Sequence, residues 1–136
     1  PWSSDYLFVD MASDLSGQEA TKAILKAAKE QHEKAEAAEW CAKYAFDGIE
    51  AGTGFMPSKE ELECIFSNRK KLSQSFALLN SEGLSGNCLL KDAFYWSSSE
   101  VTSNYAWYVR PSDGCMSYYN LKHTSRPVRC TIEFKI

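Results

Sequence analysis

The sequence predicts an α+β fold, with helices in the first half of the chain and short antiparallel strands in the second half. Apolar residues recur at helical spacing between residues 20 and 79, and from Ala93 onward short apolar runs alternate with turn residues. The chain has 136 residues, of which 44% are hydrophobic and 24% are charged. This length and composition suffice for one hydrophobic core, so we expect residues 1–136 to form a single domain.

The first half is expected to contain one strand followed by two helices. The run YLFV at residues 6–9 predicts a strand, and SGQE at residues 16–19 has the pattern of a capping box that begins a helix. Residues 20–28 carry alanines and an isoleucine at helical spacing. The polar run KEQHEK at residues 29–34 is either a solvated helical turn or a short break, and a second amphipathic helix follows through residues 37–44.

A third helix has the clearest start signal in the chain. It follows a loop at residues 47–54; Pro57 disfavours helix before it, and Ser58 with Glu61 forms a second capping box. The helix then presents an apolar face at Leu62, Ile65 and Phe66. Residues 72–79 predict a further short helical or irregular segment, before a turn-rich loop.

The second half of the chain is typical of strands joined by turns. AWYV at residues 106–109 predicts a strand, PSDG at residues 111–114 a turn, and CMSYY at residues 115–119 the returning strand. PVRCTIEF at residues 127–134 is expected to close the chain as a last strand.

Charge and cysteine usage argue against several classes of protein. The net charge of −3 favours neither nucleic acid nor an anionic membrane as a partner, and no apolar run approaches the roughly 20 residues of a membrane span. The five cysteines form no Cys-x-x-Cys pair, so we expect no zinc site, and their odd number leaves at least one unpaired within the chain. No nucleotide or metal motif is present, so we expect no metal and no cofactor. Cys41 and Cys64, among apolar helical neighbours, are expected to be small buried hydrophobes.

Catalysis has few candidate residues. His32 lies in a polar helical stretch and is expected at the surface. His123 follows Cys115 closely, so a Cys–His nucleophile pair is conceivable, but the sequence offers no recognisable third residue to orient it. The glutamates within residues 60–63 are more typical of a solvated helix face than of an acid–base pair. We therefore expect a protein that is not an enzyme.

The most informative segment is rich in tyrosine, serine, asparagine and glycine. Four of the seven tyrosines fall between residues 105 and 119, and this composition is typical of antibody-type binding loops. If Trp107 and Val109 face the core, strand alternation turns Ala106, Tyr108 and Arg110 outward. The same reasoning turns Met116 inward and Cys115 and Ser117 outward. Composition alone leaves two interpretations open, an exposed interaction surface or tyrosines that pair across a hairpin and shield the sheet.

A set of ordered motifs adds a family resemblance. SGQEATKAIL, AAEWCAKY, FMPSKEELECIF, YWSSSE, AWYV and RPVRC, in this order and spacing, resemble a bacterial domain family with a C-type-lectin-like fold. One branch forms the C-terminal domain of a collagen-like adhesin, and the fold is shared with formylglycine-generating enzyme and with the variable proteins of diversity-generating retroelements. The resemblance implies two or three helices packed on short twisted antiparallel strands, with the N- and C-terminal strands adjacent.

The resemblance also implies which residues are framework and which face a ligand. Trp96, Ser97, Ser98, Glu100, Trp107, Gly114 and the RPVR stretch correspond to framework. In the retroelement proteins, the positions between them are diversified by mutation at template adenines, often in Asn codons. The residues here that belong to the reachable set, and that we expect to bind ligand, are Ser103, Asn104, Tyr105, Tyr108, Arg110, Ser112, Asp113, Cys115, Ser117, Tyr118, Tyr119, Asn120 and His123.

The sequence differs from the wider fold at several positions, and these differences limit the functions that the resemblance implies. Pro111 stands where the family often has an aromatic residue, so the strand before it is expected to end early. The calcium motifs of animal C-type lectins are missing, as are the paired active-site cysteines of formylglycine-generating enzyme. Calcium-dependent sugar binding and the enzymatic branch are therefore disfavoured.

The leading hypothesis is a non-catalytic ligand-binding domain, a retroelement variable protein that presents residues 103–123 to a protein or glycan ligand on another cell surface. We expect display on a bacterial cell surface or phage particle, although the chain shows no signal or anchor. A second hypothesis is an adhesin for a sulfated glycan or another fixed polymer, using Arg110, Lys122, Arg126 and Arg129. A third is a thiol-dependent enzyme using Cys115 or Cys130.

Overall fold

The computed structural model confirms an α+β architecture and describes residues 1–4, 7–12, 14–44, 50–81, 93–111 and 116–132. Its helices are α1 (Gly17–Gln31), α2 (Glu36–Lys43), α3 (Lys59–Ser67) and α4 (Arg69–Ser81), one more than the two or three expected. Its strands are β1 (Tyr95–Glu100), β2 (Tyr105–Arg110) and β3 (Met116–Leu121), which form one antiparallel sheet in the order β1-β2-β3.

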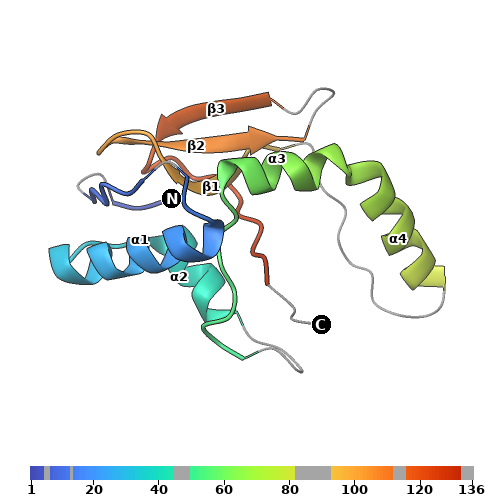
Figure 1. Ribbon diagram of the computed structural model, residues 1–136, viewed down its shortest axis with the longest axis horizontal. Helices are drawn as coiled ribbons and strands as arrows, with labels where there is room; N and C mark the ends of the chain where they lie inside the picture. Colours follow the sequence, from blue (N-terminus) through green and yellow to red (C-terminus); the bar gives the residue numbers. More distant parts are fainter. Residues whose placement is uncertain (5–6, 13, 45–49, 82–92, 112–115, 133–136) are drawn as a thin grey trace.

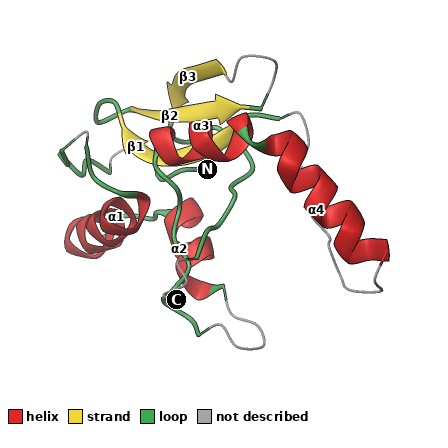
Figure 2. Cartoon of the chain, turned by 45° about the vertical axis from the view of Figure 1, so that its right-hand side comes forward, coloured by secondary structure: helices red, strands yellow, loops and turns green. Residues whose placement is uncertain are grey.

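The helices lie on two sides of the sheet. Figure 1 shows α1 and α2 below the sheet and α3 alongside it, whereas α4 projects away from the rest of the chain (Figures 1 and 2). Strand β2 ends at Arg110, directly before Pro111, as the proline predicts. None of the helices in the described ranges combines the length and the apolar character that a membrane crossing needs.

Both predicted capping boxes are confirmed, and the glutamate of the second one also contacts the start of α1. Ser16 caps α1 together with Glu19, and Ser58 caps α3 together with Glu61. The Glu61 carboxylate accepts from Ser58 N–H at 2.9 Å and also from Gly17 N–H, at 3.1 and 3.2 Å to its two oxygens. One carboxylate therefore satisfies backbone donors at the starts of two helices, which lie far apart in sequence.

The polar run at residues 29–34 combines both alternatives, because residues 29–31 form the last turn of α1 and a short break begins at His32. Helix α1 ends at His32, which adopts a left-handed conformation with φ of 55° and is exposed, as expected for this histidine. This cap turns the chain so that α2 can begin at Glu36 and pack beside α1.

The two expected terminal strands do not form within the described residues. Residues 7–12 make no strand, because the Glu100 carboxylate binds the N–H groups of Val9 and Asp10, each at 3.0 Å, and Asp10 has a φ of 53°. At the other end, Val128 and Thr131 each make one isolated bridge, to Trp96 and Phe55, in place of a continuous strand.

Hydrophobic side chains are buried on both faces of the sheet. On one face, Trp96 and Tyr108 join Ile24 of α1 and Cys41 of α2 in the larger core cluster. On the other, Tyr95 and Val109 pack with Leu62 and Phe66 of α3 in a smaller cluster. The sheet is therefore covered from two sides, and neither face is wholly a solvent face.

The cysteines differ from the expectation in two ways. Cys41 is buried as expected, but it forms a disulfide with Cys130, with the Cα atoms 5.1 Å apart. This bond ties α2 to the segment that follows β3. Cys64, expected to be buried, is a free and exposed cysteine on α3, because it lies on the opposite side of the helix from Leu62 and Phe66.

Candidate functional site

The register of β2 and β3 divides the predicted ligand-binding residues between the two faces of the sheet. Trp107 lies opposite Tyr119 and Val109 opposite Ser117, so these residues face α3. Tyr108 lies opposite Tyr118, and both point to the other face. The strands therefore do not place all of the predicted residues on one outward surface.

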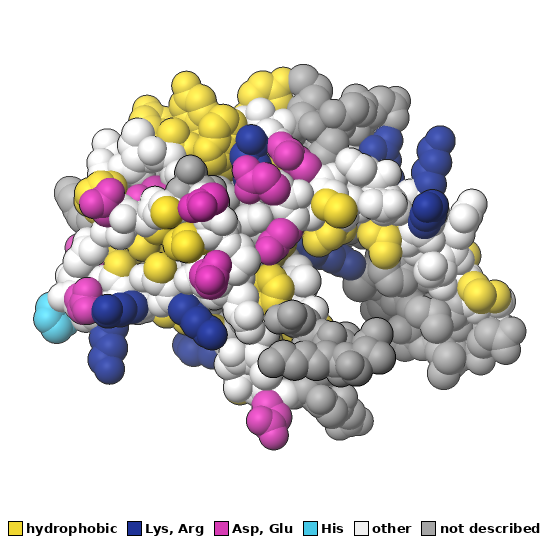
Figure 3. All heavy atoms as spheres, in the orientation of Figure 1, with side chains coloured by type: hydrophobic (Ala, Val, Ile, Leu, Met, Phe, Trp, Pro, Cys, Tyr) yellow, Lys and Arg dark blue, Asp and Glu magenta, His cyan; other side chains and the backbone are white. Residues whose placement is uncertain are grey.

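Three aromatic rings form an exposed ladder on the α3 side, which we call the aromatic ladder: Tyr105, Trp107 and Tyr119. The ring centroids of Tyr105 and Tyr119 are 5.6 Å apart, and those of Trp107 and Tyr119 are 5.5 Å apart, both edge-to-face. Tyr119 is 56% exposed, while the other two are half-buried. Hydrophobic side chains gather over β2 and β3 in Figure 3.

Charged groups of α3 border the aromatic ladder. The Lys59 ammonium lies 4.7 Å from the Trp107 ring centroid, a cation–π contact, and 3.7 Å from Glu63. The Glu63 carboxylate also accepts a hydrogen bond from the hydroxyl of Ser117, at 2.5 Å. Glu61 and Glu63, expected on a solvated face, are thus half-buried hydrogen-bonding residues, and only Glu60 is exposed.

The remaining predicted residues lie around the strands. Ser103 and Asn104 are exposed in the turn between β1 and β2, and His123 is exposed after β3, whereas Asn120 is half-buried. Ser112, Asp113 and Cys115 lie outside the described residues, as does framework Gly114. The side-chain direction expected for Met116 also falls outside what the structure describes.

Tyr108 corrects the predicted alternation. It was expected to face outward but is only 9% exposed, and its ring meets Trp96 edge-to-face at 5.7 Å. Ala106, also expected outward, is fully buried. Conversely Trp107, expected to face the core, is half-buried between Lys59 and the exposed Tyr119. The cause is that α1 and α2 cover the face that holds Ala106 and Tyr108.

A second aromatic group surrounds Phe94, which we call the Phe94 cluster: Phe94, Tyr108, Tyr118, Arg110 and Arg126. The Phe94 ring meets Tyr108 at 4.6 Å and Tyr118 at 6.0 Å, both edge-to-face. The guanidinium carbons of Arg110 and Arg126 lie 5.4 and 5.5 Å from the Phe94 centroid. Tyr118 is 41% exposed, so the cluster reaches the surface.

Lys122 is not available to a sulfated ligand. Its ammonium donates to Glu100 Oε2 at 2.7 Å and to the Leu7 carbonyl at 2.9 Å, and it lies 4.7 Å from the Trp2 ring centroid. The side chain is fully buried, and this burial lowers the pKa of Lys122, although the hydrogen bond and charge of Glu100 act to raise it. The four-cation set expected for a sulfated glycan is therefore not assembled as predicted.

The thiol candidates are also changed by the structure. Cys130 is bonded to Cys41, so its sulfur is not free to act as a thiolate nucleophile. Cys115, the other candidate, lies outside the described residues. Among the side chains that the structure describes, no three metal-binding groups come together.

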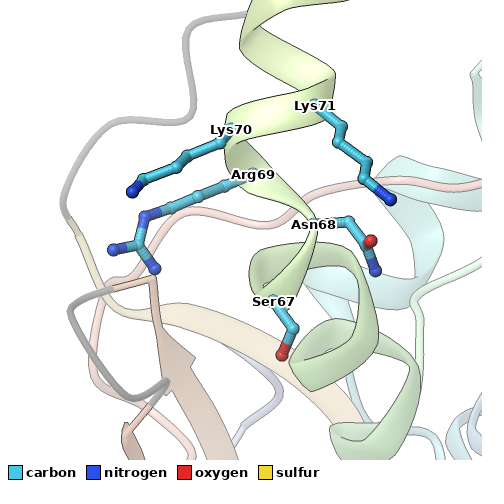
Figure 4. A pocket seen from close by; sticks show the side chains of 5 residues that line it. All are labelled: Ser67, Asn68, Arg69, Lys70 and Lys71. Carbon is cyan, nitrogen blue, oxygen red and sulfur yellow. The ribbon is translucent and has the colours of Figure 1, made fainter.

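A basic hollow lies where α3 meets α4. It has a volume of about 390 Å³ and is lined by Ser67, Asn68, Arg69, Lys70 and Lys71. Figure 4 shows Arg69 and Lys70 pointing to one side and Lys71 to the other. Because the cations diverge, the hollow does not present a converging set of donors to one ligand.

The structure adds residues that the sequence did not assign to a binding surface. The resemblance implied that Trp107 is a framework residue, and the sequence indicated no binding role for Lys59 or Phe94. The pairing of Trp107 with Tyr119 could have been found from the hairpin register, whereas the approach of Lys59 depends on how α3 packs. Comparisons of the chain with protein-family models, with curated proteins and with solved structures found no match.

Proposed function

We propose that this chain is a non-catalytic ligand-binding domain with a C-type-lectin-like fold, and that it is the variable protein of a diversity-generating retroelement. The observation that carries the proposal is the exposed aromatic ladder on β2 and β3, beside a framework of buried residues. Trp96, Ser97 and Ser98 of β1 are fully buried, while Tyr119 is the most exposed tyrosine among the described residues of the sheet. Recognition surfaces combine rigid support with exposed tyrosines in this way.

The ligand surface in this proposal consists of the ladder and the polar residues around it. Ser103, Asn104 and Ser117 supply adaptable hydrogen-bonding groups, and Tyr119 supplies contact area at a low entropic cost. Tyr108 is removed from the ligand-facing set, since its ring is part of the core. The α3 residues Lys59 and Glu63 form the border of this surface.

The disulfide is consistent with display outside the cytoplasm. Stable disulfides form in oxidising compartments such as cell surfaces and extracellular particles. The Cys41–Cys130 bond joins a helix to the terminal segment that also bridges to β1 through Val128. Such a bond would hold the framework together while the ligand surface varies.

The tolerance of the surface to substitution can be measured without knowing the ligand. We expect Ser103→Tyr, Asn104→Tyr and Tyr119→Asn to change the melting temperature by no more than about 5 °C, since exposed positions contribute little to stability. As a matched framework control, Ser98→Asn should lower it much more, because the fully buried Ser98 has no room for a larger side chain. Equal losses at both kinds of position would refute a variable surface on a fixed framework.

The retroelement assignment has its own test in the genome. The proposal requires a reverse transcriptase gene beside a near-copy of the codons for residues 96–129, with the differences confined to adenines of the near-copy. A locus without both features would refute that assignment and leave only the binding surface.

A further inference from the structure

We propose that Arg126, supported by Arg110, forms a subsite for a single carboxylate group of a protein ligand. The subsite lies in the Phe94 cluster, on the opposite face of the sheet from the aromatic ladder. The preference for a carboxylate follows from the arginines themselves. Only the statement that the carboxylate belongs to a protein ligand rests on the proposed function.

Arg126 is held in place by aromatic rings. Its guanidinium carbon lies 5.5 Å from the centroid of Phe94 and 5.5 Å from that of Tyr108. Tyr108 is itself fixed by Trp96, which is fully buried. The guanidinium therefore has a defined position, and a ligand need not order a flexible side chain.

The charge of Arg126 has no acid partner among the residues that the structure describes. Its Nε atom is buried and meets no hydrogen-bond acceptor there. An arginine cannot release its proton, so the positive charge stays in place without an acid partner among these described residues. The side chain as a whole is only half-buried, which leaves part of it open to a ligand.

Arg110 adds a second positive charge to the same ring. Its guanidinium carbon lies 5.4 Å from the Phe94 centroid, so two cations share one ring in a chain whose net charge is −3. Arg110 therefore places a second guanidinium group beside the ring that holds Arg126. Tyr118, whose ring centroid lies 6.0 Å from that of Phe94, is 41% exposed and brings the cluster to the surface.

The arrangement favours one carboxylate over a polyanion. A sulfated polymer needs a row of cations, whereas Lys122 is already paired with Glu100 and only two arginines converge here. A planar guanidinium matches a carboxylate through two parallel hydrogen bonds. The exposed Tyr118 of the same cluster is typical of surfaces that bind proteins, so under the proposed function the carboxylate is that of an Asp or Glu side chain.

The test is an NMR titration of the intact, disulfide-bonded chain with sodium glutarate at constant ionic strength, with neutral glutaramide as the matched probe. The arginine Nε–H signals report directly, and that of Arg126 is assigned by its loss in Arg126→Lys. We expect a saturable shift of this signal with a Kd on the order of 10 mM, and none with glutaramide.

Variants then show which arginines bind glutarate. In each variant, glutarate binding is measured from the shift of the Tyr118 amide signal. Arg126→Gln should weaken glutarate binding at least about tenfold, and Arg110→Gln should weaken it less. Arg129→Gln removes an arginine three positions along the same segment and should leave it unchanged. Each variant is used only if its spectrum shows a folded domain. If Arg126→Gln does not fold, the titration of the wild-type Arg126 signal still decides whether the subsite binds a carboxylate.

Three results would overturn the proposal. The first is the absence of a saturable Arg126 shift up to about 100 mM glutarate. The second is equal binding by wild type and folded Arg126→Gln. The third is a heparin fragment that binds at this site more than tenfold more tightly than glutarate, which would show a polyanion subsite. None of these results would affect the substitution test on Ser103, Asn104 and Tyr119.

Discussion

Two tyrosines offer a matched pair of substitutions, because they lie on neighbouring strands but differ in burial. Tyr108→Ala removes a ring that is 9% exposed and contacts Trp96, Phe94 and Arg126. Truncation of a buried aromatic residue costs about 3–5 kcal/mol. Tyr119→Ala removes a ring that is 56% exposed, and the loss of its edge-to-face contacts with Tyr105 and Trp107 should cost about 1 kcal/mol.

The assay is thermal denaturation followed by tryptophan fluorescence, which is sensitive to the environment of the buried Trp96. At the size of this chain, each kcal/mol lowers the melting temperature by about 3–5 °C, so Tyr108→Ala should lose roughly 10–20 °C and Tyr119→Ala under about 5 °C. Similar losses for both variants, or a larger loss for Tyr119→Ala, would refute the division of β2 and β3 into a core face and a ligand face.

Three further predictions concern the covalent and ionic links. Cys41→Ala should lower the free energy of unfolding by about 4–5 kcal/mol, since the disulfide to Cys130 closes a loop of 89 residues; no change in urea melts with and without reductant would show that the bond does not form. Lys122→Met should cost about 3–5 kcal/mol, because it leaves Glu100 buried and unpaired. Burial lowers the pKa of Lys122 below 10.5, so between the lowered pKa and 10.5 the unfolded chain binds more protons. The free energy of unfolding of wild type should therefore increase with pH in that window relative to Lys122→Met, and urea melts at pH 8, 9 and 10 that show the reverse slope would contradict this.

The helical half of the fold could be predicted because its signals are local. Each of two helix starts is marked by a pair of residues within four positions of sequence, Ser16 with Glu19 and Ser58 with Glu61. Even the break after α1 was one of the two alternatives that the polar run left open. The absence of the N-terminal strand could not be predicted, because the Glu100 side chain, about ninety residues away, competes for the N–H groups of Val9 and Asp10.

The candidate site was harder to predict because the sheet is covered on both faces. Alternation identifies an inward face only when the other face is in water. Here Val109 packs on α3 while Tyr108 packs near α1, so both consecutive residues are buried. Composition located the segment, but only the packing of the helices decides which tyrosine remains exposed.

The sequence also could not predict which cysteines form a disulfide. Cys41 has apolar helical neighbours like those of Cys64, yet one forms a disulfide and the other is exposed. The difference lies in which side of its helix each residue occupies and in the path of the chain after β3. That path depends on long-range contacts such as the bond from Trp96 N–H to the Pro127 carbonyl.

The shared carboxylate of Glu61 makes the starts of α1 and α3 one cooperative unit. When Glu61 swings away, Gly17 and Ser58 lose an acceptor at the same moment. Amide hydrogens in the first turns of both helices should then open to exchange together, at one rate. Substitution of Gly17 by any larger residue would disturb the same unit, because a Cβ there would lie 2.4 Å from the Met56 carbonyl oxygen. Two helix starts that look independent in the sequence should thus open and close together.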